Sequence, residues 1–381
     1  MNREINVNLA IITVISKSNK RNNDKKVIRL KKILVLFTGG TIGSMKKEKS
    51  IDVDESTSAH LIEQYKCSPY AQDVEFELHQ PLHLLSENII PEDWHRFIAF
   101  INKFPLEQYE GVIVTHGSDT LPFTSACLSY AFRHSPVPIV LTASNYPLHH
   151  PKSRGLRNFA GSVDFILDQA LPGIFVCFEN EHGEMTIYLG TRLMEALPFT
   201  DEYAATYAIP FGRIVQQRLV RNDHEINPSI AEVRAKREPL PFLDRLKFSS
   251  EIMYIKPHPG LDYRYFMFSE HKPKAVLHDL YHSGTASTRG EAMFSLRTFI
   301  QHCRQHGIKL YMSPIKNASG DLYASSVELI EAGAVPIENT SVPASLVKLM
   351  LAYGTFSAAD EIDRFLQGPP LFFESHAVSN E

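Results

Sequence analysis

The stretch ILVLFTGGTIG, Ile33 to Gly43, joins an apolar run to a glycine-rich turn. Its first five residues are all apolar, which is typical of a short strand that is buried on both faces. Gly39 and Gly40 follow, and they permit a tight turn and a close approach of the backbone to another group. Thr41 then offers a hydroxyl at the carboxyl end of the strand, the edge where ligands bind to open α/β sheets. Taken alone, the stretch is equally compatible with an ordinary strand-to-loop turn.

Strand-like and helix-like segments alternate after this stretch. Such alternation predicts an α/β fold, with a mostly parallel sheet flanked by helices. The expected strands span 33–37, 74–78, 111–115, 138–142 and 173–179, and the expected helices span 92–103, 120–132 and 156–169.

Changes in composition divide the chain into four parts. Residues 1–30 contain the polar run SNKRNNDKK, which indicates a mobile N-terminal extension. Residues 31–220 hold the alternating pattern of a first α/β domain, and the polar, proline-interrupted segment 221–247 is expected to be a linker. Residues 248–381 form the expected second α/β domain, with strands over 251–256, 275–281 and 309–313 and helices over 290–305 and near 342–353.

Composition and charge exclude several classes of protein. The chain has 381 residues, of which 44% are hydrophobic and 22% charged, as in a globular protein. Its formal net charge of -4 offers no basic surface for nucleic acid, and no apolar run is long enough to cross a membrane. The four cysteines are scattered without metal-ligand or disulfide spacing, and no signal peptide is recognisable. We therefore expect a cytoplasmic protein without a metal.

A second motif, HGSDT at residues 116–120, follows another apolar run, Gly111 to Thr115, and precedes an apolar helix. Ser118 and Asp119 thus lie at the carboxyl edge of the predicted sheet, near a helix N-terminus. Taken alone, Asp119 is best explained as a helix cap. Two hydroxyl-bearing loops at one sheet edge instead favour nucleophilic chemistry on a small polar substrate.

In order and separation, TGGTIG and HGSDT resemble the paired motifs of the bacterial-type L-asparaginase family. PEDW (91–94), PIVLTASNYPL (138–148), PG (259–260) and SGTAS (283–287) are similar to further segments of that family, so the resemblance covers roughly residues 31 to 360. It implies two α/β domains in an asparaginase-like arrangement and hydrolysis of the side-chain amide of L-asparagine, or a close relative, to aspartate and ammonia. It also implies that no cofactor is needed, and a homodimer or homotetramer whose sites are completed by a neighbouring subunit's second domain.

The resemblance assigns roles residue by residue. Thr41 matches the threonine nucleophile and Ser118 the second hydroxyl of the site. Asp119 matches the aspartate that holds the α-amino group of the small amino-acid substrate. Ser86 and Glu87 match the pair that binds the α-carboxylate and the amino group.

The chain departs from the family at three positions. Glu195 stands where the family has a lysine that activates the hydroxyl, and the chain has no lysine between Lys152 and Lys236. The family also has an acid where Arg154 stands, so the two changes are either a swapped ion pair or independent. Glu195 could act as the base if burial raised its pKa. The family's tyrosine shortly after the nucleophile is absent as well.

Two alternatives remain at this point. One is a binding protein that keeps the residues for binding the α-amino and α-carboxylate groups of a small amino acid but no longer catalyses hydrolysis. The other is the amidase subunit of a tRNA-dependent amidotransferase, although an extension of 30 residues is too short for the extra N-terminal domain of those chains. The choice among asparagine, glutamine and another amide is not determined by these residues.

Overall fold

The computed structural model of the chain describes residues 31–40, 44–47, 50–53, 56–200, 202–268, 270–290, 292–316, 320 and 322–376. Within these ranges, residues 31–376 form one compact unit with two larger sheets and a two-stranded hairpin. The hairpin consists of β2 (Ser44–Lys47) and β3 (Ser50–Val53). Thr41 lies outside the described residues.

The larger sheet has eight strands in the order β10-β9-β8-β7-β6-β5-β1-β4. The five strands from β7 to β4 pair in parallel, whereas β8, β9 and β10 pair antiparallel at the other edge. All residues of β5, β6 and β7 are buried, as expected for parallel strands covered on both faces. The bounds are β1 Lys32–Phe37, β4 Glu75–His79, β5 Gly111–Thr115, β6 Pro138–Thr142, β7 Gly173–Glu179, β8 Met185–Leu189, β9 Gly212–Val215 and β10 Arg218–Arg221.

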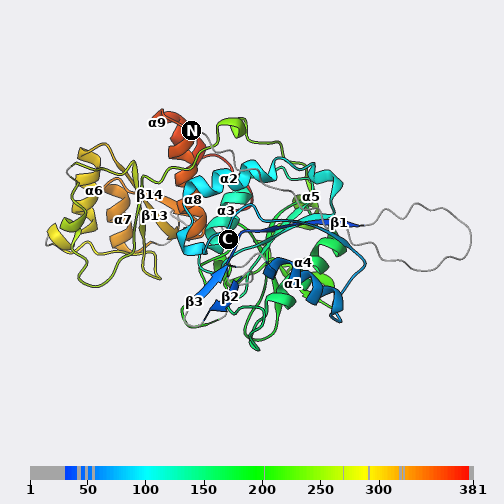
Figure 1. Cartoon of the computed structure of the whole chain (residues 1–381). Coiled ribbons are helices and arrows are strands. Elements are labelled where there is room, and N and C mark those ends of the chain that lie inside the picture. Colours follow the sequence, from blue (N-terminus) through cyan, green and yellow to red (C-terminus); the bar gives the residue numbers. More distant parts are fainter. Residues whose placement is uncertain are drawn as a thin grey trace, which may run out of the picture. The chain divides into compact units, whose positions relative to one another are not determined.

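Helices cover both faces of this sheet. In Figure 1, α2 and α3 lie on one side of β1, and α1 and α4 lie on the other. Helix α2 has proline at its first position, and the Asp93 carboxylate accepts the backbone N–H of Ile90 at 3.1 Å, so the PEDW segment caps this helix. The bounds are α1 Ser56–Cys67, α2 Pro91–Ile101, α3 Leu121–Ala131, α4 Gly155–Gln169 and α5 Ile230–Arg234.

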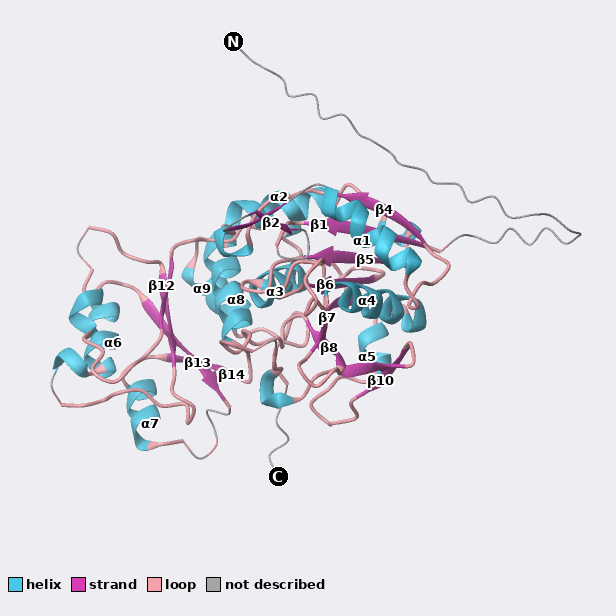
Figure 2. Ribbon diagram, turned by 60° about the horizontal axis from the view of Figure 1, so that its bottom comes forward, coloured by secondary structure: helices cyan, strands magenta, loops and turns pink. Residues whose placement is uncertain are grey.

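The smaller sheet has four parallel strands in the order β11-β12-β13-β14, of which Figure 2 labels β12, β13 and β14. The helix expected over 290–305 begins only at Leu296, and a 3₁₀ turn over Ala292–Phe294 precedes it. The bounds are β11 Ile252–Ile255, β12 Ala275–Asp279, β13 Lys309–Ile315, β14 Val335–Glu338, α6 Leu296–Gln305, α7 Ala324–Glu331, α8 Val342–Thr355 and α9 Ala359–Leu366. The predicted α/β class, with sheets flanked by helices, is thus confirmed.

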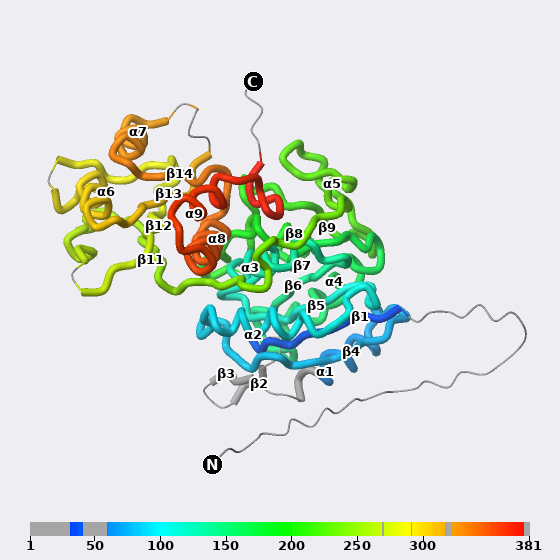
Figure 3. The backbone as a smooth tube through the Cα atoms, turned by 90° about the horizontal axis from the view of Figure 1, so that it is seen from above, coloured from blue at the N-terminus to red at the C-terminus, as the bar shows by residue number. Residues whose placement is uncertain are grey.

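Helix α8 lies between the two sheets, as Figure 3 shows. Its Val347 and Leu351 are buried in the core of the large sheet, whereas Leu349 packs with Leu277 and Tyr311 of the small sheet. The segment predicted as a linker also contributes to the large core, through the buried side chains of Val233, Leu240 and Phe242. The domain boundaries given above stay a proposal.

Candidate active site

Three loops meet beyond the carboxyl ends of β1 and β5. The first is the turn after β1, the second contains Leu84 to Asn88, and the third is the loop after β5. Gly39 pairs with Leu84 in a parallel bridge, and the Gly40 N–H donates to the Leu84 carbonyl at 3.1 Å. The Thr38 hydroxyl and N–H both donate to the Thr115 carbonyl, at 2.9 and 3.1 Å. The turn after β1 is therefore bonded both to the end of β5 and to the loop that contains Leu84.

The glycines of these loops allow the close approach. Gly39 and Gly40 have φ values of 105° and 74°, which side chains other than glycine rarely adopt. A Cβ added at Gly40 would lie 2.4 Å from the backbone nitrogen of Gly117. A Cβ added at Gly117 would lie 2.3 Å from the Ser86 hydroxyl. The two glycine-bearing motifs are thus in backbone contact, with Ser86 against the second.

Ser86 and Asp119 are brought together. The Ser86 hydroxyl donates to the Asp119 carboxylate at 3.4 Å, although 33 residues separate them. The Thr120 hydroxyl donates to the Ser86 carbonyl at 2.9 Å. Helix α3 begins at Leu121 without a side-chain cap, so Asp119 does not cap it. The interpretation of Asp119 as a helix cap is therefore wrong, and its exposed carboxylate faces Ser86 and solvent.

Ser118 is half-buried, and its carbonyl accepts a hydrogen bond of 2.6 Å from the Tyr203 hydroxyl. Tyr203 is only 4% exposed. Burial raises the pKa of Tyr203, and the nearby charge of Asp119 raises it further, so its hydroxyl stays protonated as a donor. Sequence reasoning missed Tyr203 because no motif surrounds it and its partner lies 85 residues away.

His116, the first residue of the HGSDT motif, is fully buried. Its Nδ1 donates to the Gly117 carbonyl at 2.8 Å, and its Nε2 has no hydrogen-bond partner among the described residues. Burial lowers the pKa of His116 to about 4, so the ring is neutral near pH 7. The ring therefore braces the turn at Gly117 and places no positive charge beside Asp119.

Glu87 and Glu195 have exposed side chains. Glu87 lies beside Ser86 in the 3₁₀ turn Ser86–Asn88. Glu195 lies on the loop after β8, near the small sheet. Burial raises the pKa of Tyr254 on β11, the hydrogen bond and charge of Asp279 raise it further, and the charge of Glu195 adds to this effect. Because the Glu195 side chain is exposed, it lacks the burial that its proposed role as a base requires.

Arg154 does not pair with Glu195. Its guanidinium donates to the carbonyls of Glu179 and Glu181, at 3.1 and 3.3 Å, beyond the end of β7. The buried Glu179 carboxylate pairs instead with Arg157 at 2.7 Å. No ion pair joins Arg154 and Glu195, both of which are described, so the swapped-pair interpretation is wrong for this chain. The reason is topological, because Arg154 precedes α4 and reaches the end of β7, whereas Glu195 extends toward the second sheet.

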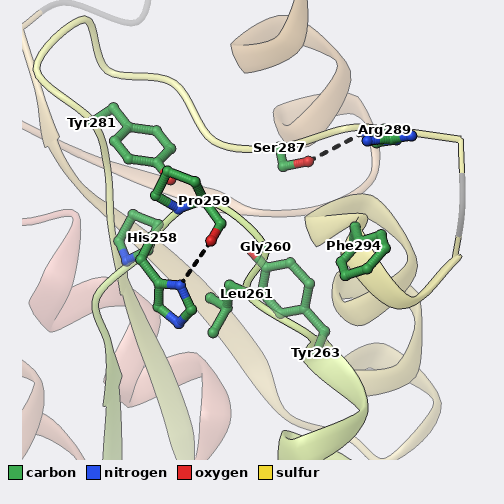
Figure 4. A pocket seen from close by; sticks show the side chains of 10 residues that line it. His258, Pro259, Gly260, Leu261, Tyr263, Tyr281, Ser287, Arg289 and Phe294 are labelled. Carbon is green, nitrogen blue, oxygen red and sulfur yellow. Dashed lines mark hydrogen bonds between the residues drawn. The ribbon is translucent and has the colours of Figure 1, made fainter.

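A separate hollow of about 220 Å³ lies in the part of the chain that carries the small sheet. Figure 4 shows His258, Pro259 and Gly260 on one side of it, and Ser287 and Arg289 on the other. The two loops that form it contain the PG and SGTAS segments. Aromatic side chains complete its lining, from Tyr263, Tyr281 and Phe294.

Metal-binding and membrane-spanning features are both missing from the described ranges. Within them, no group of three or more histidine, cysteine, aspartate or glutamate side chains could hold a metal ion. No helix there combines the length and the apolar character needed to cross a membrane.

Residues 32–221 match a family model described as Asparaginase, N-terminal. The chain is 29% identical over 342 residues to an L-asparaginase of Thermococcus kodakarensis, covering 88% of this chain and 97% of that protein. It is 25% identical over 356 residues to one of the subunits of glutamyl-tRNA(Gln) amidotransferase from Methanococcus maripaludis, covering 89% of this chain and 79% of that protein. The solved structure of the thermostable L-asparaginase from Thermococcus kodakarensis superposes with a TM-score of 0.74, at 26% identity over 91% of this chain and all of that one.

Proposed function

Since this chain belongs to the asparaginase family of amidohydrolases, we propose that it hydrolyses the side-chain amide of L-asparagine, or of a closely related amino acid, to the acid and ammonia. The observation that supports this proposal most directly is the meeting of three loops at one sheet edge, with the Ser86 hydroxyl against the Asp119 carboxylate. A hydroxyl and a carboxylate at this spacing suit the α-carboxylate and α-ammonium groups of a small amino acid.

The proposed reaction uses Thr41 as nucleophile. Its hydroxyl oxygen attacks the amide carbon and gives up its proton, and the C–N bond then breaks as ammonia leaves with a proton. Water hydrolyses the resulting ester, which releases the acid and restores Thr41. Ser118 is proposed to supply the second hydroxyl of the site. Asp119 and Glu87 are proposed to bind the substrate's α-ammonium group.

The reaction also needs a base that takes the proton from the attacking hydroxyl. Glu195 is the candidate because the resemblance to the family places a lysine at its position in the sequence. Its exposure is evidence against the role, and no hydrogen bond joins it to Ser118, although both residues are described. If Glu195 is the base, Glu195→Gln removes most of the activity; if it is not, the variant keeps wild-type rates.

The deciding experiment is ammonia release from a panel of amides by the full chain. Asparagine, glutamine, D-asparagine and succinamate are compared, with wild type, Thr41→Ala and Ser118→Ala in parallel. Thr41→Ala is expected to lose activity by orders of magnitude, on the order of 10⁶ in a comparable hydrolase, while still binding asparagine by calorimetry. Unchanged turnover in Thr41→Ala would exclude TGGTIG as the catalytic centre.

A second candidate function is a binding protein for a small amino acid that has no turnover. The missing lysine and the exposed Glu195 favour it. Its signature is calorimetric binding of asparagine by the wild type, without ammonia release at any pH from acid to alkaline.

The similarity to an amidotransferase subunit supports a third candidate, the amidase subunit of a tRNA-dependent enzyme. The net charge of -4 weighs against a chain that itself contacts tRNA. Ammonia release that requires a partner subunit and misacylated tRNA would identify this function.

We also propose that the chain works as a homodimer or homotetramer in the cytoplasm. The hollow between the PG and SGTAS loops is the proposed surface that completes a neighbour's site. Support for the cytoplasm comes from the four cysteines, all of which are free. Light scattering gives the assembly, and a monomer with full activity would refute the shared site.

A further inference from the structure

Tyr203 contacts the HGSDT loop from a hairpin-like segment that follows β8. The Met194 N–H donates to the Ala204 carbonyl at 2.9 Å, and Leu193 forms an antiparallel bridge with Ala205. These contacts place residues 204–205 antiparallel to residues 193–194. Tyr203 is therefore held at a defined position relative to the end of β8.

Tyr203 is held on several sides. Its backbone N–H donates to the Asn180 side-chain oxygen at 3.2 Å, and its carbonyl accepts the Tyr188 hydroxyl at 3.0 Å. Its ring meets the edge of Phe178, with 4.8 Å between the ring centroids. A buried tyrosine bonded in this way has little rotational freedom, so the direction of its hydroxyl is set by the surrounding structure.

The hydroxyl donates to the Ser118 carbonyl, which belongs to the peptide group joining Ser118 to Asp119. A planar peptide moves as a unit, so fixing this carbonyl also fixes the Asp119 N–H and the start of the Asp119 side chain. The Asp119 carboxylate itself has one long bond, at 3.4 Å, from Ser86. The peptide, more than the carboxylate, determines where Asp119 points.

We propose that Tyr203 is a positioning residue for substrate selection, which orients the Ser118–Asp119 peptide so that the Asp119 carboxylate faces the substrate's α-ammonium group. This inference rests on the proposed function, because it assigns the α-amino grip to Asp119. The substrate class it defines is amides that carry a free α-amino group.

The test compares Tyr203→Phe with Tyr130→Phe. Tyr130 is buried like Tyr203, and its hydroxyl donates to the Ala344 carbonyl at 3.0 Å, away from the site. Both variants lose one buried hydrogen bond to a carbonyl, so their thermal unfolding is expected to change alike. Only Tyr203→Phe is expected to disturb the HGSDT loop.

Two measurements separate positioning from general stability. Hydrogen exchange of residues 116–120 in the ligand-free protein is expected to rise several-fold in Tyr203→Phe and to stay unchanged in Tyr130→Phe. The preference for asparagine over succinamate, taken as a ratio of kcat/KM or of Kd, is expected to fall roughly tenfold in Tyr203→Phe only, as for one lost hydrogen bond.

An unchanged preference with unchanged exchange would overturn the inference, and so would faster exchange with an unchanged preference. A wild type that neither hydrolyses nor binds asparagine would refute the proposed function and the selectivity role, while exchange would still decide whether Tyr203 holds the loop. If Tyr203→Phe does not fold, Tyr188→Phe loosens the Tyr203 backbone more gently, and the same two shifts are expected at smaller size.

Discussion

At the proposed site, single side chains make contacts between residues that are far apart in the sequence. Ser86 contacts Asp119, and Tyr203 contacts Ser118, from loops that follow different strands. Glu195, the proposed base, has no hydrogen bond to any of these described residues. The residues proposed to bind substrate thus contact one another, whereas the proposed base does not join them.

Asp164 is a single residue whose burial opposes its charge. It lies on α4, is 7% exposed and accepts a hydrogen bond from the Gln72 side chain. Burial raises the pKa of Asp164 to about 6, and the charge of Asp168 adds to this effect. The ionised carboxylate is therefore less stable in the folded chain than in the unfolded chain.

We predict that Asp164→Asn stabilises the protein above about pH 6. A folded pKa raised by about two units costs at most about 3 kcal/mol once the group is ionised, and the cost vanishes below about pH 4, where both states are protonated. Urea unfolding at pH 8 should therefore show a gain of about 1–3 kcal/mol, and at pH 4 almost none. Asp73→Asn, at an exposed position nearby, is the control. An equal gain at both pH values would contradict this assignment.

At the scale of elements, the parallel strands carry the site by ending at one edge. Strands β1 and β5 are direct neighbours, so Thr38 bonds to Thr115 at the end of β5 and Gly40 packs against Gly117 without any intervening element. Gly117 lies where the loop after β5 meets the Ser86 turn. The Ser86 side chain packs so closely against Gly117 that no space is left for one added carbon.

We predict that Gly117→Ala separates these loops. The new Cβ would lie 2.3 Å from the Ser86 hydroxyl, so a shift on the order of 1 Å is required, and such a shift typically costs roughly 100-fold in rate. The measurements are kcat/KM for asparagine and the thermal midpoint. Gly290→Ala, which meets no atom within 4 Å, is the matched control. Wild-type activity in Gly117→Ala would show that the contact does not constrain the site.

At the scale of the whole described chain, the C-terminal residues attach helix α8, which lies between the two sheets, to the core of the large sheet. Glu374 is 1% exposed and accepts the Lys348 ammonium of α8 at 2.9 Å and the N–H groups of Leu371 and Phe372 at 2.8 Å each. Burial alone would raise the pKa of Glu374, but Lys348 and the two N–H groups lower it below its usual range.

We predict that Glu374→Gln destabilises the protein by about 3–5 kcal/mol, because it leaves the Lys348 charge buried without a partner. Since the lowered pKa stabilises the folded state above the unfolded pKa of about 4.3, the wild type should lose this contribution as pH falls below that value. Urea unfolding gives the free energy of unfolding of the single variant Glu374→Gln and of the double variant that also carries Lys348→Met. The double variant is expected to recover much of the stability that the single variant loses. Asp360→Asn breaks an exposed pair with Arg364 on α9 and should cost less than about 1 kcal/mol. Equal losses of unfolding free energy in Glu374→Gln and Asp360→Asn would refute the stabilising role of the buried Lys348–Glu374 pair.

The sequence by itself determined the α/β class, the places of the main strands and the two motifs after β1 and β5. Gly173–Glu179 and Pro138–Thr142 are strands as predicted, because a run of apolar residues bounded by turn formers is a local signal. Strands β9 and β10 were not predicted, because they are short and only partly buried. The buried strand β8 was not predicted either.

Only the tertiary structure decided which side chains meet. The Ser86–Asp119 contact, the Tyr203 hydroxyl on Ser118, the carbonyl partners of Arg154 and the buried Lys348–Glu374 pair each join segments that the local pattern treats as independent. Periodicity and turn chemistry report on neighbours a few residues apart, whereas these contacts depend on strand order and on how helices and loops pack across the sheet. The physical reason is that a strand's position in the sheet, and hence the neighbours of the loop that follows it, is a property of the assembled fold.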